Sequence, residues 1–547
     1  MKKILCLLLA ALMLSSTVAC ADPDTPAEET KTETEAEAEI ETETETETET
    51  ETETETAVGT AETAPDETVT ETETQVENQT ESQADTETED ASLYQCDLPS
   101  DLHYGNRPVR VLYAIVTGRE DELFVEGSGS GMIEEAVYER NQVVEDQLGI
   151  TLELIGEIGS NAVSNKLSTD VKGNVGSYDM VVNGTFAAIS SVINGYYVDL
   201  SSLEHIDTSK HYWTQGYNAL STFTAENRQY LASGSLALSM FRLMFFTIYN
   251  QSVLEDRQME DLYDVVRRGD WTLDYQYSLI AGLYDDSDGD GMRSETDTYG
   301  FITGNIISMD PYMVAGGVPL IIRAPEDNSL VFNADAASPL SDLVDAVQKL
   351  VNDEGTYVFT GVDRDDVGKE NITKAFANGK SLMATLMFWN MEHNIDELSA
   401  LSYSIAPIPK LTREQEYKSY VQDQVSSFGI SATVQKEELR EMVAATMEAL
   451  AYHSYNIIRP AYYTNTLSTK FMQSPKSADI LGIIFDSLYF DFSQTCSGIF
   501  NGTNLRNSLR PVMSGKSNNI ASQAKGWSKN MPKLIKRVNE KLEKLSG

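Results

Sequence analysis

The strongest chemical signal in the sequence is an acidic loop with the spacing of a calcium site. Aspartates at residues 286, 288 and 290 and the glycine at 291 match positions 1, 3, 5 and 6 of an EF-hand loop. The predicted oxygen ligands are Asp286, Asp288, Asp290, the Met292 carbonyl, Ser294 and Asp297. Aspartate at position 12 is shorter than the usual glutamate, so weak affinity is expected. We predict a structural calcium ion here, with an aspartate-rich surface turn as the alternative.

Other motifs that could carry catalysis fail on spacing. The five histidines form no H-E-x-x-H or other tight metal-ligand pattern. Residues 127–131, Gly-Ser-Gly-Ser-Gly, match neither G-x-G-x-x-G, because residue 132 is methionine, nor a P-loop, so we interpret them as a flexible loop. A pair of hydrolytic carboxylates remains open, because glycosidase acids lie far apart in a sequence. The sequence therefore predicts no catalytic residue and no catalytic cofactor.

The chain is strongly acidic, and its charge is unevenly distributed. Residues 21–90 hold 27 acids and one base, a net charge of −26 out of −46 for all 547 residues. Residues 91–547 carry a net charge of −22, and nothing along them resembles a basic stripe. Phosphate backbones and anionic lipid surfaces repel such a chain, so we expect it to bind neither nucleic acid nor a bare membrane surface.

Residues 1–19 have the composition of an export signal. Lys2 and Lys3 precede an apolar run from Ile4 to Leu14, which is too short to span a bilayer and is followed by small residues. Ala19 before Cys20 resembles the lipobox of bacterial lipoproteins, in which the cysteine is acylated and becomes the new N-terminus. We expect a lipid anchor at Cys20 on the extracellular face of the cytoplasmic membrane, with plain secretory cleavage as the alternative.

Two cysteines remain beyond the signal and the predicted lipid site. In an exported chain, Cys96 and Cys496 could form one disulfide between the start of the folded region and its C-terminal part. In a reducing habitat both would stay thiols. Their spacing does not decide between the two states.

Residues 20–92 are expected to be the lipidated cysteine and a disordered linker. From Thr30 to Thr56 the chain consists almost wholly of glutamate, threonine and alanine. The alternation has the period of a strand, but neither face is apolar, so burial cannot stabilise a sheet. We interpret the segment as a solvated, self-repelling spacer; a calcium-buffering or glycan-bearing stalk is the alternative.

Residues 93–547 alternate between expected strands and helices. Strands are predicted near residues 109–113, 150–155 and 178–183, with a helix over 133–148 between the first two. The helix has one apolar stripe, made by Ile133, Ala136, Val137, Val144 and Leu148. Further on, a strand at 299–303 and helices at 340–351 and 437–455 are expected. This order indicates α/β layers with a largely parallel sheet.

Across residues 105–515 the sequence resembles the extracellular solute-binding proteins of bacterial ABC importers, of the carbohydrate type found as Gram-positive lipoproteins. The resemblance rests on an ordered series of short motifs. It includes Y-D-M-V-V-N-G (178–184), Y-V-D-L-S-S-L (197–203), G-D-W-T-L-D (269–274), N-G-K-S-L-M (378–383), A-P-I-P-K (406–410) and P-A-Y-Y (460–463). Their order and spacing indicate the family but not the ligand.

The resemblance implies a two-lobed, periplasmic-binding-protein-like α/β fold with a ligand cleft between the lobes, within residues 93–547. Crossing segments between the lobes are expected near residues 245–250 and 420–431, with closure as a hinge motion. Aromatic rings would stack on sugar rings and polar groups would bind the hydroxyls. The candidate ligand-binding residues are Trp213, Trp389, Asp423, Tyr462 and Tyr463.

The sequence thus predicts a lipid-anchored receptor, not an enzyme, that delivers a carbohydrate to an ABC permease. An oligosaccharide is the expected cargo, with a peptide or another polar solute as alternatives. The expected partners are the solute and the permease subunits, and a monomer is expected. A surface adhesin or structural lipoprotein, favoured by the long linker, is the first rival function. An extracellular enzyme acting on glycans is the second.

Overall fold

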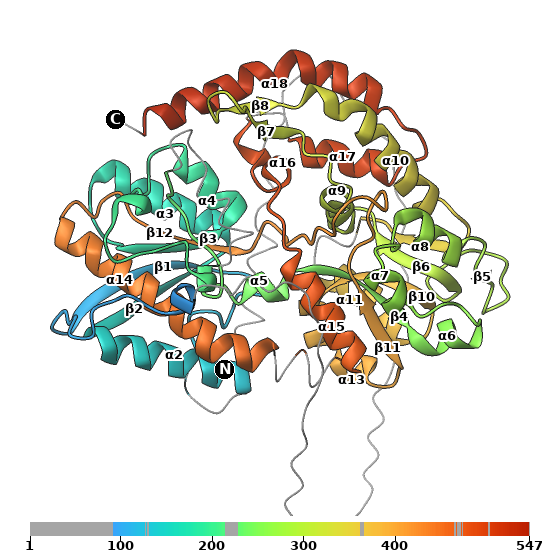
Figure 1. Ribbon diagram of the computed structural model, residues 1–547, viewed down its shortest axis with the longest axis horizontal. Helices are drawn as coiled ribbons and strands as arrows, with labels where there is room; N and C mark the ends of the chain where they lie inside the picture. The colour runs from blue at the N-terminus through green and yellow to red at the C-terminus, as the bar shows by residue number, and fades with distance from the viewer. Residues whose placement is uncertain are drawn as a thin grey trace, which may run out of the picture. The chain divides into compact units, whose positions relative to one another are not determined.

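The computed structural model describes residues 91–125, 127, 131–213, 228–361, 366–463, 467, 472, 474–500 and 504–545. The predicted export signal, Cys20 and the predicted linker up to residue 90 lie outside the described residues, as do residues 128–130 of the serine–glycine loop. The described part contains two lobes, each with its own mixed sheet and covering helices (Figure 1). The predicted two-lobed α/β fold is therefore confirmed.

The first lobe is built on a four-stranded sheet in the order β12-β3-β1-β2. Its strands are β1 (Arg107–Ile115), β2 (Ile150–Ile158), β3 (Met180–Gly184) and β12 (Ser426–Ile430). β1 is parallel to β2 and β3, whereas β12, which comes from much later in the chain, is antiparallel to β3. β3 is buried along its whole length, as expected for an apolar strand covered on both faces.

Helices lie on both faces of this first sheet. They are α2 (Met132–Leu148), α3 (Ser160–Gly173), α4 (Thr185–Val192) and α14 (Glu437–His453), with shorter turns η1 (Ala91–Tyr94), η2 (Leu200–Ser202), η3 (His211–Trp213) and η7 (Ser454–Ile458). In Figure 1, α3 and α4 lie on one side of the strands and α2 and α14 on the other. The predicted apolar stripe of the 133–148 helix is buried, which confirms its orientation.

The second lobe is built on a six-stranded sheet in the order β11-β4-β10-β6-β5, with β9 also paired to β6. Its strands are β4 (Phe245–Asn250), β5 (Tyr284–Asp285), β6 (Thr298–Gly304), β9 (Thr356–Phe359), β10 (Ser381–Met387) and β11 (Tyr403–Ala406). β6, β9 and β10 run parallel, whereas β4 is antiparallel to both β10 and β11. A separate hairpin joins β7 (Ile321–Arg323) to β8 (Leu330–Phe332).

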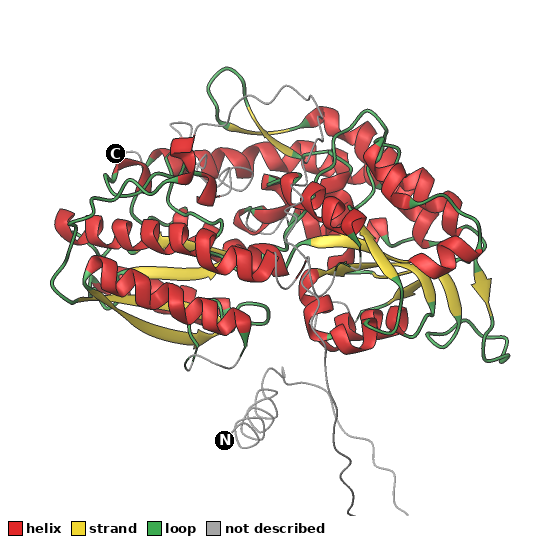
Figure 2. Cartoon of the chain, turned by 60° about the horizontal axis from the view of Figure 1, so that its bottom comes forward, coloured by secondary structure: helices red, strands yellow, loops and turns green. Residues whose placement is uncertain are grey.

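The helices of the second lobe cover its sheet (Figure 2). They are α6 (Gln251–Asp256), α7 (Leu262–Arg267), α8 (Leu273–Ile280), η5 (Ile307–Met309), α9 (Asp310–Ala315), η6 (Ala334–Ala336), α10 (Ala337–Val351), α11 (Asp366–Ala377), α12 (Phe388–His393), α13 (Ile395–Leu398) and α15 (Pro475–Asp486). The Thr272 hydroxyl caps α8 by accepting a hydrogen bond from the Tyr275 N–H at 3.2 Å.

Three backbone segments lie side by side where the chain passes between the lobes. Phe245 donates its N–H to the Tyr420 carbonyl at 3.0 Å, and Gln422 donates to the Leu243 carbonyl at the same distance. Ser419 in turn pairs with the segment after α15, because Tyr489 donates its N–H to the Ser419 carbonyl at 2.9 Å. α5 (Ser239–Arg242) leads into this three-segment junction, hereafter the junction.

The crossings differ in position from those that the sequence predicted. Residues 245–250 form β4 inside the second sheet, and the passage lies just before them. Of residues 420–431, the first part belongs to the junction and the last part is β12 of the first sheet. The physical reason is burial. All six side chains of β4 are buried, and the backbone groups of such a strand are hydrogen-bonded when it pairs with strands on both sides.

The C-terminal segment adds α16 (Phe492–Thr495), η9 (Ser497–Ile499), α17 (Leu505–Met513) and α18 (Ile520–Glu543). α18 packs on α10 and β8 of the second lobe, and beyond it the Leu545 carbonyl accepts a hydrogen bond from the Tyr230 hydroxyl of the first lobe at 3.4 Å. No helix in the described part is long and apolar enough to cross a membrane.

α18 also corrects one expectation. Five lysines and one arginine of the helix, and Lys544 directly after it, are exposed, so a basic stripe does exist. The net charge of residues 91–547 concealed it, because a sum over the chain takes no account of which side chains share a helix face.

Candidate functional site

The carboxyl ends of strands from both sheets approach each other at the junction. The segment after β1 contains Gly118, at which an added Cβ would lie 2.9 Å from Leu243 Cδ2 and 3.4 Å from Trp389 Cδ1. Trp389 belongs to α12, which follows the carboxyl end of β10. Gly118 has φ +80°, so this close approach needs a residue without a side chain. In open α/β sheets, ligands bind at such strand ends.

A buried arginine joins the two lobes at this point. Arg242 donates from Nη2 to Asp121 Oδ2 at 3.0 Å, and from Nε to Glu392 Oε2 at 2.8 Å. Asp121 follows β1 in the first lobe, whereas Glu392 lies on α12 in the second. Burial opposes ionisation of Asp121, but hydrogen bonding to Arg242 and its positive charge outweigh burial, and the pKa of Asp121 is lowered. The three side chains form a charge triad that spans the junction.

Three of the predicted ligand-binding aromatics lie around this triad. The Tyr462 hydroxyl donates to Glu392 Oε2 at 3.4 Å, and its ring centroid lies 5.9 Å from the Arg242 guanidinium. Trp389 stands one helical turn before Glu392 on α12. Tyr463 contacts Phe485, with ring centroids 5.4 Å apart. Tyr462 is 0% and Trp389 4% exposed, so protein side chains cover both rings, and only Tyr463 is partly exposed.

Asp423 is the predicted residue that the second crossing brings to the junction. Its carboxylate accepts a short hydrogen bond from Arg506 Nη1 of α17, and its carbonyl accepts from the Phe186 N–H at 3.1 Å. Asp423 is 6% exposed, so it is a buried ion-pair partner. Beside it, Arg510 Nε donates to Asp310 Oδ1 at 2.8 Å.

A polar hollow of about 480 Å³ lies where the carboxyl end of β6 meets α17. Its lining residues are Asn305, Ile306, Asn507, Arg510, Pro511, Ser514 and Gly515. Amide, hydroxyl and guanidinium groups of this kind bind the hydroxyls of a polar solute. The hollow is therefore the part of the strand-end region with room for a ligand group.

Trp213 does not join the other aromatics. Its ring is 0% exposed, and its Nε1 donates to Glu448 Oε2 at 2.8 Å, deep in the first lobe. The Tyr212 hydroxyl and the Asp207 N–H donate to the same carboxylate. Burial raises the pKa of Glu448 to about 7, although these donors favour the ionised form. The prediction that Trp213 contacts a ligand does not fit a ring whose N–H is already used inside the core.

Sequence reasoning missed the most connected residue of the junction, Arg242. It is the sole charged residue between Gln229 and Asn250. A buried guanidinium in an apolar run requires carboxylate partners, so that isolation was a usable signal for a paired site. Its partners Asp121 and Glu392 could not be found in the same way, because acids are abundant throughout the chain.

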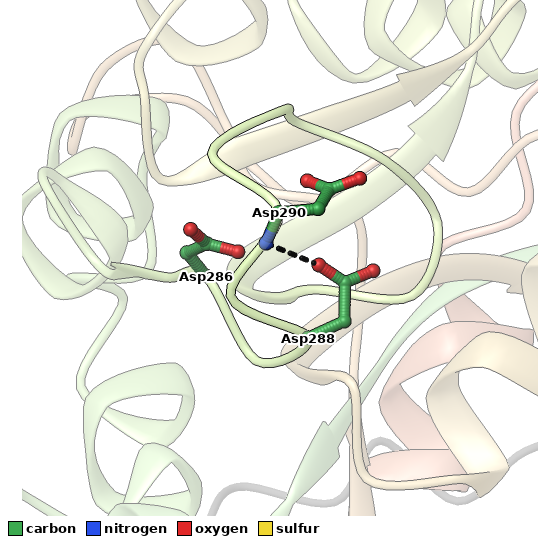
Figure 3. Close-up of side chains that lie close together, drawn as sticks. All are labelled: Asp286, Asp288 and Asp290. Atoms are coloured by element: carbon green, nitrogen blue, oxygen red, sulfur yellow. Dashed lines mark hydrogen bonds between the residues drawn. The ribbon is translucent and has the colours of Figure 1, made fainter.

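The three exposed aspartates of the acidic loop lie close together (Figure 3). One carboxylate oxygen from each of Asp286, Asp288 and Asp290 lies within 4.8 Å of the others, and all three side chains are exposed. Asp286 accepts hydrogen bonds from the N–H groups of Gly289 at 2.9 Å and Gly291 at 3.0 Å. Asp288 accepts one from the Asp290 N–H at 3.1 Å, drawn in Figure 3. These are the bonds of consecutive Asx turns.

The predicted ligands at the end of the loop, Ser294 and Asp297, already form hydrogen bonds within the loop. Asp297 is 0% exposed and accepts hydrogen bonds from the N–H groups of Ser287 at 3.2 Å and Ser294 at 2.9 Å. Its two oxygens thus close the loop from inside, while the Met292 side chain is exposed. The Ser294 hydroxyl lies 2.6 Å from that of Thr296. The three exposed aspartates suit a hard cation such as calcium, and Asp297 would have to turn to complete the shell.

The disulfide that the sequence left open is not formed, because Cys96 and Cys496 are both free thiols. Burial raises the pKa of both. Cys96 lies near Lys210 and Glu448 of the first lobe, whereas Cys496 is 1% exposed and lies near Arg323 of β7. The two thiols are held in separate surroundings, which explains why they do not pair.

No protein-family model matches the chain, and no curated protein is significantly similar to it in sequence. Solved structures do match. A sugar transporter protein of Rhizobium etli in an open conformation is 12% identical, with a TM-score of 0.49 over 80% of this chain and 99% of that one. An ABC substrate-binding protein of Listeria monocytogenes in complex with cycloalternan is 13% identical, with a TM-score of 0.45 over 81% and 99%.

A third similar structure is the GacH receptor of Streptomyces glaucescens, solved unliganded and in complex with acarbose. It is 14% identical, with a TM-score of 0.46 over 79% of this chain and 99% of that one.

Proposed function

We propose that the protein is an extracellular receptor that binds a carbohydrate, an oligosaccharide in particular, and delivers it to an ABC permease. The observation that carries the proposal is the meeting of strand ends from two lobes at a junction of three crossing segments. A solute that contacts both lobes there favours one relative position of the lobes over others. Ligand binding is thereby coupled to a hinge motion.

The chemistry around the junction suits a neutral, polar solute. Arg242 is paired with Asp121 and Glu392, and Arg506 with Asp423, so these charges largely compensate one another. The polar hollow beside α17 offers amide and hydroxyl groups, and Tyr463 is the partly exposed aromatic residue among the three that lie around the triad. Sugar rings need this combination of ring faces and hydrogen-bonding groups.

The carboxylates of the charge triad do not suit the rival function of a glycan-cleaving enzyme. Glycoside hydrolysis needs a carboxylic acid that stays protonated near neutral pH. The pKa of Asp121 is lowered by Arg242, and Glu392 binds the same guanidinium. An adhesin is the other rival, and it would need neither cleft closure nor small-molecule binding.

Lipid anchoring at Cys20, and location on the outer face of the cytoplasmic membrane, are part of the proposal. They rest on the order of charged, apolar and small residues in residues 1–20. One acyl chain would bind a membrane only marginally, so stable anchoring needs at least two. Mass spectrometry of the exported protein tests this, since a diacylated or triacylated Cys20 would be the first residue.

We further propose that the acidic loop binds calcium as a structural ion. Three carboxylate oxygens within 4.8 Å of one another support a hard-cation site. The loop begins directly after β5 and ends directly before β6, so an ion would stiffen the edge of the second sheet.

The test of the receptor is thermal unfolding of residues 21–547 against mono- and oligosaccharides and peptides. A solute that binds only the folded state, at 100 times its dissociation constant, adds ~2.7 kcal/mol and raises the midpoint. We expect a raised midpoint with one class of oligosaccharide, which chromatography then recovers unchanged. Conversion of the sugar would favour the enzyme, and an unchanged midpoint across the panel would favour the adhesin.

A further inference from the structure

The outer face of α18 is densely basic, although the protein as a whole is strongly acidic. Residues 516–544 hold eight bases and two acids, a net charge of +6 in a chain of −46. Seven exposed basic side chains, together called the basic face of α18, are Lys525, Lys529, Lys533, Lys536, Arg537, Lys541 and Lys544. The receptor proposal uses none of them.

The geometry of α18 places these side chains in one row. They follow one another at intervals of mostly three or four residues, while the residues buried against α10 and β8 occupy the opposite side. At about 1.5 Å per residue, the row is roughly 30 Å long. Lys536 approaches Glu540 only at 3.9 Å, with both side chains more than half exposed. The charge of the row is therefore largely uncompensated.

We propose that the basic face of α18 docks on an anionic phospholipid surface. Six of the seven bases are lysines, and a lysine ammonium attracts phosphate headgroups as a point charge without needing bidentate geometry. α18 runs along the edge of the described part (Figure 1), and the row lies on the side of the helix opposite its buried residues, so it is open to a flat partner.

Nucleic acid is a poorer partner for the same face. Binding of single strands relies on exposed aromatic rings on which bases stack. The sole aromatic residue of α18, Trp527, is 6% exposed and packs inward. The helix is also held against the second lobe along its length, which limits its entry into a groove.

The acidic charge elsewhere does not prevent docking. At physiological ionic strength, charges are screened over about 8 Å, so a surface in contact with α18 experiences mainly the local row. Each lysine at an anionic surface strengthens binding roughly fivefold. Docking would orient the two lobes relative to the membrane, and it requires no acyl chain.

The test is binding of residues 21–547, without lipid, to vesicles of phosphatidylcholine with about 30% phosphatidylglycerol, at about 50 mM salt. The test variant is K525Q/K529Q/K533Q/K541Q. The matched control, K172Q/K374Q/K436Q/K476Q, removes four exposed lysines and the same charge elsewhere. Thermal unfolding of all three proteins verifies folding.

We expect the wild type and the control to bind these vesicles and not pure phosphatidylcholine. The α18 variant should bind several hundredfold more weakly, at roughly fivefold per lysine. Absence of wild-type binding, or an equal loss in the control, would overturn the proposal. So would tighter binding to a random-sequence DNA duplex than to vesicles, if the same four lysines were responsible. Failure of sugar binding leaves this result unaffected.

Discussion

Charged side chains are arranged differently at the junction and on the outer surface. At the junction, Arg242 is buried and bound by two carboxylates, and the largely buried Arg506 is bound by one, all from other segments. On the surface, the acidic loop and the basic face of α18 gather like charges in solvent. A buried charge must be paired, so it holds segments together. Exposed like charges repel one another, and an added ion or a charged surface relieves that repulsion.

The largest expected effect comes from breaking the buried triad. Arg242→Met leaves Asp121 and Glu392, both partly buried, without their cation, which costs up to about 3–5 kcal/mol of folding free energy. Urea unfolding measures the loss. The matched control is Arg268→Met, since Arg268 also binds two acids, Glu260 and Asp270, but in solvent. Its midpoint should hardly change, and equal losses in the two variants would remove the contrast.

The next effect is a pH dependence of folding stability that comes from the buried acid Glu448. The pKa of Glu448 is raised from 4.5 to about 7 by burial, so the folded state binds a proton that the unfolded state releases. Its contribution to stability is fully present below pH 4.5 and is lost as the pH rises through about 7, a change of about 3 kcal/mol.

Urea unfolding from pH 4.5 to 8 checks this. Glu448→Gln should flatten the profile, because the amide keeps the size of the acid and does not ionise. Glu438→Gln, on the same helix but exposed, should leave the wild-type profile unchanged. If the stability of Glu448→Gln depended on pH as that of the wild type does, another group would be responsible.

A smaller effect is expected from calcium at the acidic loop. Extracellular sites bind with dissociation constants of about 10⁻⁴–10⁻³ M, so 10 times that concentration adds ~1.4 kcal/mol and raises the thermal midpoint. Asp286→Asn/Asp288→Asn/Asp290→Asn should abolish the rise. Asp274→Asn/Asp342→Asn/Asp396→Asn, which removes three aspartates elsewhere, should keep it. A rise that survives in the loop variant would place the ion elsewhere.

The smallest effect is expected in the polar hollow. Asn507 is exposed at its rim, and its Oδ1 accepts a hydrogen bond from Arg510 Nη1 at 3.0 Å. Asn507→Ala should weaken sugar binding about 3- to 10-fold, as for loss of one hydrogen bond, with little change in unfolding. Isothermal titration calorimetry measures the affinity. Asn519→Ala, at the start of α18, is the control, and a similar loss there would argue against the hollow.

Local patterns predicted several elements because their signal lies within a few residues. The apolar stripe of α2, the buried strand β3 and the Asx turns of the acidic loop all follow from short-range spacing. The crossings were displaced, because an apolar run such as β4 does not reveal whether it links two sheets or lies inside one.

The candidate site was only partly predictable for a related reason. Trp389, Tyr462, Tyr463 and Asp423 were selected by residue type, and the structure brings them to the junction. Trp213 was selected on the same grounds, and it is a core residue bonded to Glu448. Residue type does not separate a ligand platform from a core ring, since both roles use the same apolar surface.

The sequence alone determined the alternation of strands and helices, the spacing of the three aspartates, and the lysine intervals of α18. Each depends on backbone periodicity or on neighbours within a few residues. Only the tertiary structure decided which distant charges meet: Asp121 and Glu392 at Arg242, and Asp423 at Arg506. Those pairings follow from the burial of whole segments against one another, which brings together residues more than eighty positions apart.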